Sequence, residues 1–250
     1  MKDKLGYRLV QGSLIVIAVW YLLHFAAGSG IIPSPHAAIA AFFRLLGEGI
    51  VLHMAVSFYR ICMALLFSII IGVPLGLWLG MSKKADAALS PAVYITYPIP
   101  KAALLPVFMI LLGLGDKSKI VLIISVIVFQ ILIAARDGVK EITTDLLLSV
   151  RSLGLNKCQI YRHLILPAVL PKILSAIRIS IGISISVLFF AETFATSYGI
   201  GYFIMNNWIM VNYVDMFAGI LALSIMGILL FLGLDWLEQK LCPWVFLNHQ

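Results

Sequence analysis

Long apolar runs separated by short polar stretches dominate the pattern along the chain. A helix needs about 20 mostly apolar residues to cross the hydrocarbon core of a membrane. On this basis we expect six membrane-spanning helices, at about residues 13–27, 52–81, 89–113, 120–135, 167–190 and 216–234. A further apolar helix, residues 36–47, is too short to span, so we place it at the membrane interface. The pattern predicts an all-α fold, a polytopic membrane helical bundle in which residues 1–250 form one domain.

The composition supports the membrane assignment. Hydrophobic residues make up 62% of the 250 residues and charged residues 12%, whereas soluble domains have about 45–50% and about 25%. A globule of this size cannot cover such an apolar excess with polar side chains. This excludes an ordinary soluble enzyme, a disordered chain and a nucleic-acid-binding domain. The formal net charge of +7 resembles that of nucleic-acid-binding proteins, but the basic residues are scattered between apolar runs.

The distribution of basic residues predicts the orientation, because Lys and Arg accumulate in cytoplasmic loops. With the N-terminus inside, 12 of the 18 basic residues fall on the cytoplasmic side and 3 on the external side. We therefore expect both termini in the cytoplasm. The first span resembles a cleavable signal peptide, but we interpret it as an uncleaved anchor. Its removal would leave five spans and would no longer agree with the distribution of basic residues over the remaining loops.

The third span is broken by four prolines between residues 91 and 106. Its patch of Tyr94, Tyr97 and Pro100 is partly polar, and unwound backbone at membrane depth is tolerated only where protein or a water-filled cavity covers it. We therefore consider these three residues candidates for the translocation pathway. A kink that only shapes helix packing explains the prolines equally well.

Two ionisable residues inside predicted spans, Arg60 and Glu192, are costly to bury unpaired. They could pair with each other in a mainly structural role. Alternatively, Glu192 could line an external gate and Arg60 could help attract an anion. Both are therefore also candidate pathway residues.

Gly72, Gly76 and Gly80 recur at every fourth position of the second span. Small residues at this spacing share one helix face and let another backbone approach closely. This pattern indicates helix packing, within the subunit in preference to packing across a dimer.

The polar segment at residues 137–167 is the most informative part of the sequence. Gly154 is typical of a helix C-terminus, and a second, amphipathic helix should begin near Asn156. Ile160, Leu164 and Pro167 would face the bundle, while basic side chains stay in water. The segment could be a plain connecting hairpin, or a rigid peg that a soluble partner grips.

This segment resembles the "EAA" signature of ABC importer permeases, in the residues Leu148-Ser149-Val150, Gly154 and Leu164-Ile165-Leu166-Pro167. Leu148 replaces the acidic residue of that signature. Further short motifs occur in the order found in the nitrate, sulfonate and taurine branch: Ser57-x-x-Arg60, Gly72-x-x-x-Gly76-x-x-x-Gly80, Ile99-Pro100, Leu105-Pro106, Gly115-Asp116, Ala191-Glu192 and Gly199-Ile200-Gly201. The resemblance covers residues 33–236, and Gln130 departs from it where that branch has proline.

The resemblance implies half of a type I importer pore for a small solute, a nitrate-, sulfonate- or taurine-like anion or a vitamin precursor, in the cell inner membrane. The implied partners are an ABC ATPase subunit, a second permease copy or paralogue and a periplasmic or lipid-anchored binding protein, besides membrane lipid and without nucleic acid. ATP and Mg²⁺ would be bound by the ATPase, so this chain would hold no cofactor and no metal. The residues implied to couple to the ATPase are Ser149, Val150, Arg151, Gly154, Leu155, Asn156, Lys157, Tyr161, Leu164, Leu166 and Pro167.

Two other functions are weaker interpretations. A secondary transporter or channel subunit driven by ion gradients would favour inverted repeats or a chain of mid-span carboxylates, and we find neither. An enzyme would need a catalytic or phosphate-binding signature. Gly115-Asp116-Lys117-Ser118 only resembles the end of a phosphate-binding loop, and Asp116 would repel phosphate.

Overall fold

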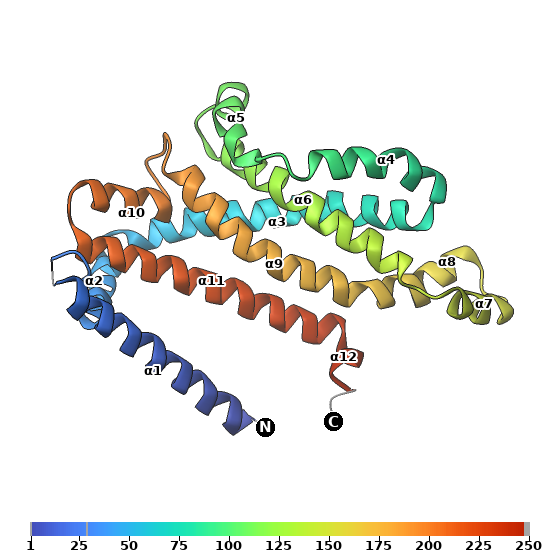
Figure 1. The fold of residues 1–250 in the computed structure, drawn as a ribbon, viewed down its shortest axis with the longest axis horizontal. Coiled ribbons are helices and arrows are strands. Elements are labelled where there is room, and N and C mark those ends of the chain that lie inside the picture. The colour runs from blue at the N-terminus through green and yellow to red at the C-terminus, as the bar shows by residue number, and fades with distance from the viewer. Residues whose placement is uncertain (1, 29, 248–250) are drawn as a thin grey trace. The chain divides into compact units, whose positions relative to one another are not determined.

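The structure is a computed structural model that describes residues 2–28 and 30–247 (Figure 1). Every regular element in these residues is helical, which confirms the predicted all-α class. The elements are α1 (Lys2–Ala27), α2 (Pro35–Glu48), α3 (Ile50–Met81), α4 (Lys83–Thr96), η1 (Lys101–Leu104), α5 (Leu105–Leu112), α6 (Asp116–Lys140), α7 (Thr144–Ser152), α8 (Lys157–Ile160), η2 (Tyr161–Ile165), α9 (Leu166–Glu192), α10 (Ile200–Ile209), α11 (Tyr213–Leu241) and α12 (Pro243–Leu247).

Four helical stretches of the described residues are long and apolar enough to cross a membrane: α3, α6, the continuous stretch Lys157–Glu192 and α11. A fifth arises if α4 and the stretch Lys101–Leu112, which meet at an angle of 79°, are counted as one broken span. The apolar part of α1, Gln11–Ala27, is shorter. The helices predicted from the apolar runs are therefore present, while the count of six spans remains a prediction.

The chain divides into two compact units. The first contains the described residues of Met1–Ser57 and of Glu192–Met226, and the second those of Phe58–Ala191 and of Gly227–Gln250. Helices α3, α9 and α11 each contribute residues to both units. The first unit thus holds α1, α2 and α10, and the second holds the broken span, α6, α7 and α8.

In the first unit, α2 is the helix expected at residues 36–47. Its buried side chains Pro35, Ala38, Ala41 and Leu45 recur with helical spacing along one face. The connection between residues 192 and 215, which is rich in glycine, asparagine and aromatic residues, contains the ten-residue helix α10. A Cβ added at Gly219 of α11 would lie 2.8 Å from Ile204 of α10, so the two helices are in close contact.

In the second unit, the glycine face of α3 (Gly72, Gly76 and Gly80) lies directly against α6 of the same chain. A Cβ added at Gly72 would lie 3.0 Å from the carbonyl oxygen of Val128, and one at Gly80 would lie 2.6 Å from Cβ of Val139. Any side chain at these positions would therefore push α3 and α6 apart.

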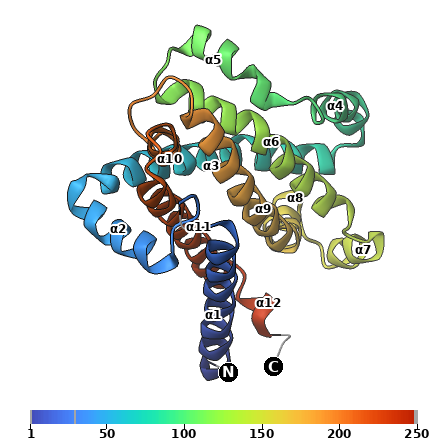
Figure 2. The same ribbon diagram turned by 60° about the vertical axis from the view of Figure 1, so that its left-hand side comes forward.

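Two bends place the remaining elements of the second unit. Helix α4 folds back from the C-terminal end of α3, and α7 and α8 lie beyond the C-terminal end of α6 (Figures 1 and 2). Helix α5 packs on α6 through a small apolar core in which Leu105, Leu122 and Ala191 are buried. The C-terminal end of α6 is thus close to both the α3–α4 turn and the α7–α8 segment.

Candidate functional site

The α7–α8 segment (residues 144–160) is a helical hairpin built by local capping. Gly154 has φ +77°, the left-handed conformation that glycine adopts readily after a helix end. Asn156 caps α8: its side chain accepts a hydrogen bond from the Gln159 backbone at 2.9 Å, and the Gln159 side chain accepts one from the Asn156 backbone at 2.8 Å. This reciprocal capping box confirms the predicted helix start at Asn156.

The segment is largely exposed but joined rigidly to a long helix. Ile160 and Ile165 are buried at 9% and 8% exposure, while Arg151 and Lys157 are exposed. From Lys157 the helix continues without a break to Glu192, 36 residues in all. Within it η2 has π-helical geometry, a local irregularity that is frequent at functional sites. The geometry is that of a peg attached to a membrane-spanning helix.

The residues predicted to couple to an ATPase differ in exposure in a regular way. Those around the α7–α8 turn are exposed: Ser149, Arg151, Gly154, Asn156 and Lys157. The other residues of the set are partly buried: Val150, Leu155, Tyr161, Leu164, Leu166 and Pro167.

A buried lysine, Lys101, stabilises the break in the broken span. Between α4 and η1 the helix stops at residues 97–100, where Pro98 and Pro100 cannot donate backbone hydrogen bonds. Lys101, 8% exposed, donates from Nζ to the carbonyl oxygens of Thr96 at 2.9 Å and Tyr97 at 2.8 Å. Lys101 thereby satisfies carbonyl groups that the break has freed.

A cavity of about 510 Å³ lies beside this break, between α4, α6 and α9. Two of the predicted pathway residues, Tyr94 and Tyr97, line it, whereas Arg60, Pro100 and Glu192 are not among its lining residues. The other lining residues are Gln130, Ile133, Ala134, Asp137, Lys172, Ser175, Ala176 and Ile179. The cavity therefore combines aromatic, apolar and charged groups, a mixture typical of small-molecule sites.

Gln130 also lines this cavity. In the sequence it stands out only as a departure from the resemblance, and no role was predicted for it. Its Oε1 accepts a hydrogen bond from Ser180 Oγ at 3.4 Å, which links α6 to α9. Its signal in the sequence is the glutamine at a position where the resemblance implies proline.

Arg60 is buried at 3% exposure and forms a salt bridge with Asp116 at the start of α6. Its Nη2 and Nε lie 2.6 and 2.8 Å from one oxygen of that carboxylate. The sequence contained both residues among its ordered motifs but did not pair them. The pairing of Arg60 with Glu192 remains a prediction.

Glu192 is fully buried in a hydrogen-bonded cluster of the first unit. Ser57 Oγ donates its hydrogen to this carboxylate, at 2.8 Å from one oxygen and 2.9 Å from the other. The backbone N–H of Gly201 donates to it at 2.8 Å, and that of Ile200 donates to Ser57 Oγ at 2.8 Å. A Cβ on Gly199 would lie 2.5 Å from the Glu192 oxygens, so only glycine fits there. Three separate sequence motifs thus meet in one buried cluster.

A second ionic cluster, which sequence reasoning missed, joins α4 to α6. Asp86 forms salt bridges with both Arg136 and Lys140. Arg136 also donates from Nη1 to the hydroxyl of Tyr94 at 2.9 Å. This cluster connects the cavity beside the broken span to the end of α6 that faces the α7–α8 segment.

The comparisons with known proteins agree with this architecture. Residues 72–246 match the family described as "Binding-protein-dependent transport system inner membrane component". The chain is 34% identical to the taurine transport system permease protein TauC of Escherichia coli (strain K12), over 77% of this chain and 70% of TauC. It is 30% identical to SsuC of Bacillus subtilis (strain 168), which is assigned to aliphatic sulfonates transport, over 95% of this chain and 88% of SsuC.

One solved structure, titled as an inward-facing conformation of the MetNI methionine ABC transporter, shares the fold. Its TM-score is 0.65 at 22% identity, over 77% of this chain and 95% of the matched chain. The alternative of an ion-gradient-driven transporter receives no support from these comparisons. Together with the apolar helices, the family match makes the chain a multi-pass integral membrane protein. The chain therefore belongs to the binding-protein-dependent transport system inner membrane components and is a permease subunit of an ABC importer, not itself an enzyme.

Proposed function

We propose that this permease subunit forms half of the pathway for a small sulfonate- or taurine-like anion, delivered by an external binding protein. Two of the relatives carry taurine or aliphatic sulfonates in their names. A third, the formylaminopyrimidine transport permease protein ThiX of Halalkalibacterium halodurans, is 26% identical over 96% of this chain, and it keeps vitamin precursors among the candidate solutes. A second permease copy or paralogue would complete the pathway.

The observation that carries the proposal is the exposed α7–α8 segment and its continuity with the helix Lys157–Glu192. A partner ATPase that binds ATP and Mg²⁺ would grip this segment and move it when two ATPase subunits close. Because α8 continues through η2 into α9, such a displacement would pass directly into a membrane-spanning helix. The energy of hydrolysis thus enters through the partner, and this chain needs no phosphate-binding loop.

We further propose six spans, with both termini in the cytoplasm of a cell whose inner membrane holds the protein. The basic residues of the second unit support this orientation. Lys83, Lys140, Arg151 and Lys157 gather around one cavity at the C-terminal end of α6. Lys117 lies at the other end of α6, a helix of 25 residues that extends about 38 Å. The basic cluster marks the cytoplasmic end by the positive-inside rule.

The cavity lined by Tyr94 and Tyr97 is the part of the pathway that this chain would supply. Lys172, which forms a salt bridge with Glu141, lies on its wall beside Asp137, and a sulfonate would have to compete with these carboxylates for its positive charge. Arg136, hydrogen-bonded to Tyr94 and salt-bridged to Asp86 and Asp137, places a second, paired cation beside the same wall.

The test is ATP-dependent uptake by the complete transporter in liposomes, after the cognate binding protein and its ligand have been identified by calorimetry. We expect taurine-loaded binding protein to stimulate ATP hydrolysis, and Tyr97→Ala to lower uptake several-fold while that hydrolysis persists. Tyr59→Ala is the matched control, because Tyr59 is an exposed tyrosine of α3 that does not line the cavity. Uptake that follows an ion gradient without ATP would refute the proposal.

A further inference from the structure

A second cavity, of about 730 Å³, lies where the α3–α4 turn, the C-terminal end of α6 and the α7–α8 segment meet. Its volume is within the range of small-molecule sites, about 300–1,000 Å³. Arg151 and Lys157 of its wall also belong to the segment that the ATPase would grip, but none of the functions described above assigns the cavity a ligand. The charged residues that line it are Lys83, Lys140, Arg151, Lys157 and Asp86.

These charges leave a strong positive excess. Asp86 is already bonded to Lys140 and to Arg136, so its carboxylate neutralises cations that it contacts directly. No carboxylate of the described residues forms a salt bridge with Lys83, Arg151 or Lys157. Three basic groups from three different elements therefore converge on one cavity and are available to an anion.

The rest of the wall is apolar. Val139, Leu147, Ile160 and Ile165 contribute to it, from both α6 and the α7–α8–η2 stretch. A small inorganic anion would leave this surface uncovered, whereas an amphiphile would contact the cations with its headgroup and the apolar wall with its chains. The charge and the apolar wall together specify an anionic amphiphile.

We propose that this cavity binds one anionic phospholipid, with its phosphate headgroup among Lys83, Arg151 and Lys157. Basic pockets between membrane helices on the cytoplasmic side are known to suit such headgroups. The bound lipid would bridge the α3–α4 turn to the α7–α8 segment and steady the segment that the ATPase grips. The choice of leaflet rests on the proposed orientation, but binding itself does not depend on transport.

The experiment measures lipid binding to the purified full-length permease. The protein is placed in nanodiscs of phosphatidylcholine with 30% phosphatidylglycerol, or of phosphatidylcholine alone, and the lipids retained on release are counted by native mass spectrometry. We expect one phosphatidylglycerol to be retained. Lys83→Gln should weaken its retention about fivefold, the effect of one basic residue near an anionic lipid surface.

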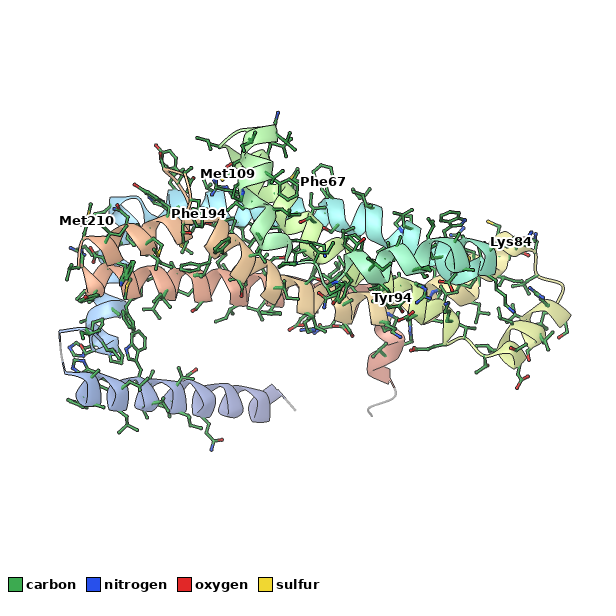
Figure 3. All side chains as sticks on the ribbon, turned by 45° about the horizontal axis from the view of Figure 1, so that its top comes forward. Phe67, Lys84, Tyr94, Met109, Phe194 and Met210 are labelled. Atoms are coloured by element: carbon green, nitrogen blue, oxygen red, sulfur yellow. The ribbon has the colours of Figure 1, made fainter. Side chains whose placement is uncertain are left out.

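Lys84→Gln is the matched control, since Lys84 is the next residue of α4, is also exposed, and does not line the cavity. Figure 3 shows Lys84 at the first turn of α4, at the opposite end of this helix from Tyr94. Leu147→Trp is a second test that leaves the charge unchanged: the indole would fill the cavity and block the lipid. Leu146→Trp, an exposed neighbour outside the cavity, is its control.

Loss of retention in Lys83→Gln and Leu147→Trp, with both controls unchanged, supports the proposal. Equal loss in Lys83→Gln and Lys84→Gln would overturn it, because any surface lysine would then suffice. Displacement of the lipid by millimolar inorganic phosphate would assign the site to a soluble anion. If no lipid is retained and only the bound ATPase covers the cavity, the cavity would belong to the interface with that partner. Both results overturn the lipid assignment. None of these readouts requires transport, so the proposed function can fail independently.

Discussion

The glycine face of α3 and the α7–α8 segment are both parts of the second unit, both were recognised as sequence motifs, and their surroundings are opposite. Each glycine of the face is in contact with α6, so that a single added carbon would meet backbone or side-chain atoms. Gly154 in the α7–α8 turn has nothing within 4 Å of an added Cβ and is itself exposed. The same residue type thus fills two different needs: close approach in one region and backbone conformation in the other.

This difference separates two kinds of motif. A motif whose side chains are buried against the same chain is accounted for by the fold itself, and its loss should be measured as loss of stability. A motif that is exposed, capped locally and joined to a long helix contributes few contacts to the fold. Its loss should be measured in the coupling to a partner, with the free energy of unfolding little changed.

The largest expected loss of stability follows Gly76→Val. A Cβ there would lie 2.8 Å from Cβ of Ala135 and still closer to the carbonyl oxygen of Leu132, so α3 and α6 must separate. Overpacking of this kind costs about 3 kcal/mol when backbone has to move. Thermal unfolding of the purified permease measures it. Gly182→Ala, in α9 with open space around the added carbon, is the control and should be neutral or stabilising.

An unchanged unfolding temperature for Gly76→Val would mean that α3 and α6 are not held together by this face. The distinction between buried and exposed motifs would then lose its clearest case.

Glu192→Gln should have the next largest effect, because the Glu192 cluster is the second buried motif. The carboxylate accepts from Ser57 at both oxygens and from the Gly201 N–H at one of them, and an amide replaces one of these acceptor oxygens with an NH₂ donor inside the buried cluster. Leaving a buried donor unsatisfied costs about 1–3 kcal/mol. Glu48→Gln, at the exposed end of α2, is the control and should change stability by less than about 0.5 kcal/mol.

Thermal-shift measurements and uptake assays on the same samples separate the two interpretations of Glu192. Equal losses of stability and transport support a structural role. Full stability with lost transport would instead assign Glu192 to an external gate.

Much of the fold was readable from local signals. Apolar runs predicted the long helices, prolines predicted the broken span, and Gly154 with Asn156 predicted the α7–α8 turn, because each of these features depends on neighbouring residues only. The ten residues of α10 are not among the predicted helices, because the glycines and asparagines nearby are typical of turns and loops. Its side chains pack on α11, a tertiary contact that local propensity does not contain.

The partners of buried charges were the least predictable feature. Arg60 contacts Asp116, which is 56 positions away, and Asp86 contacts Arg136, which is 50 positions away. Such pairings depend on how helices are placed side by side. Lys172 and Arg178 also form salt bridges with residues distant in the sequence, with Glu141 and with Asp235 and Glu238, respectively.

Gly154→Val tests the exposed motif and should affect coupling more than stability. The left-handed conformation costs a residue with a Cβ roughly 1–2 kcal/mol, and valine is β-branched, so the α7–α8 turn should shift its geometry. We expect the permease to unfold at nearly the wild-type temperature but to lose ATPase binding or ATP-driven uptake. Gly154→Asn is the matched control. Because asparagine tolerates this conformation, this variant should retain coupling. Full coupled transport by Gly154→Val would count against the peg mechanism.

The smallest effect on stability, and the sharpest test of which side the segment faces, comes from its native cysteine. Cys158 of α8 is exposed, whereas Cys242 is buried; burial, and to a lesser extent the charge of Glu238, raise the pKa of the Cys242 thiol. Because the thiolate is the reactive form, a membrane-impermeant maleimide should label Cys158 much faster than Cys242. Labelling should occur in inside-out vesicles and be blocked by the bound ATPase. Cys158→Ser should abolish the fast labelling while changing stability by less than about 0.5 kcal/mol. Labelling from the external side would reverse the proposed orientation, and with it the assignment of this exposed segment to an ATP-driven partner.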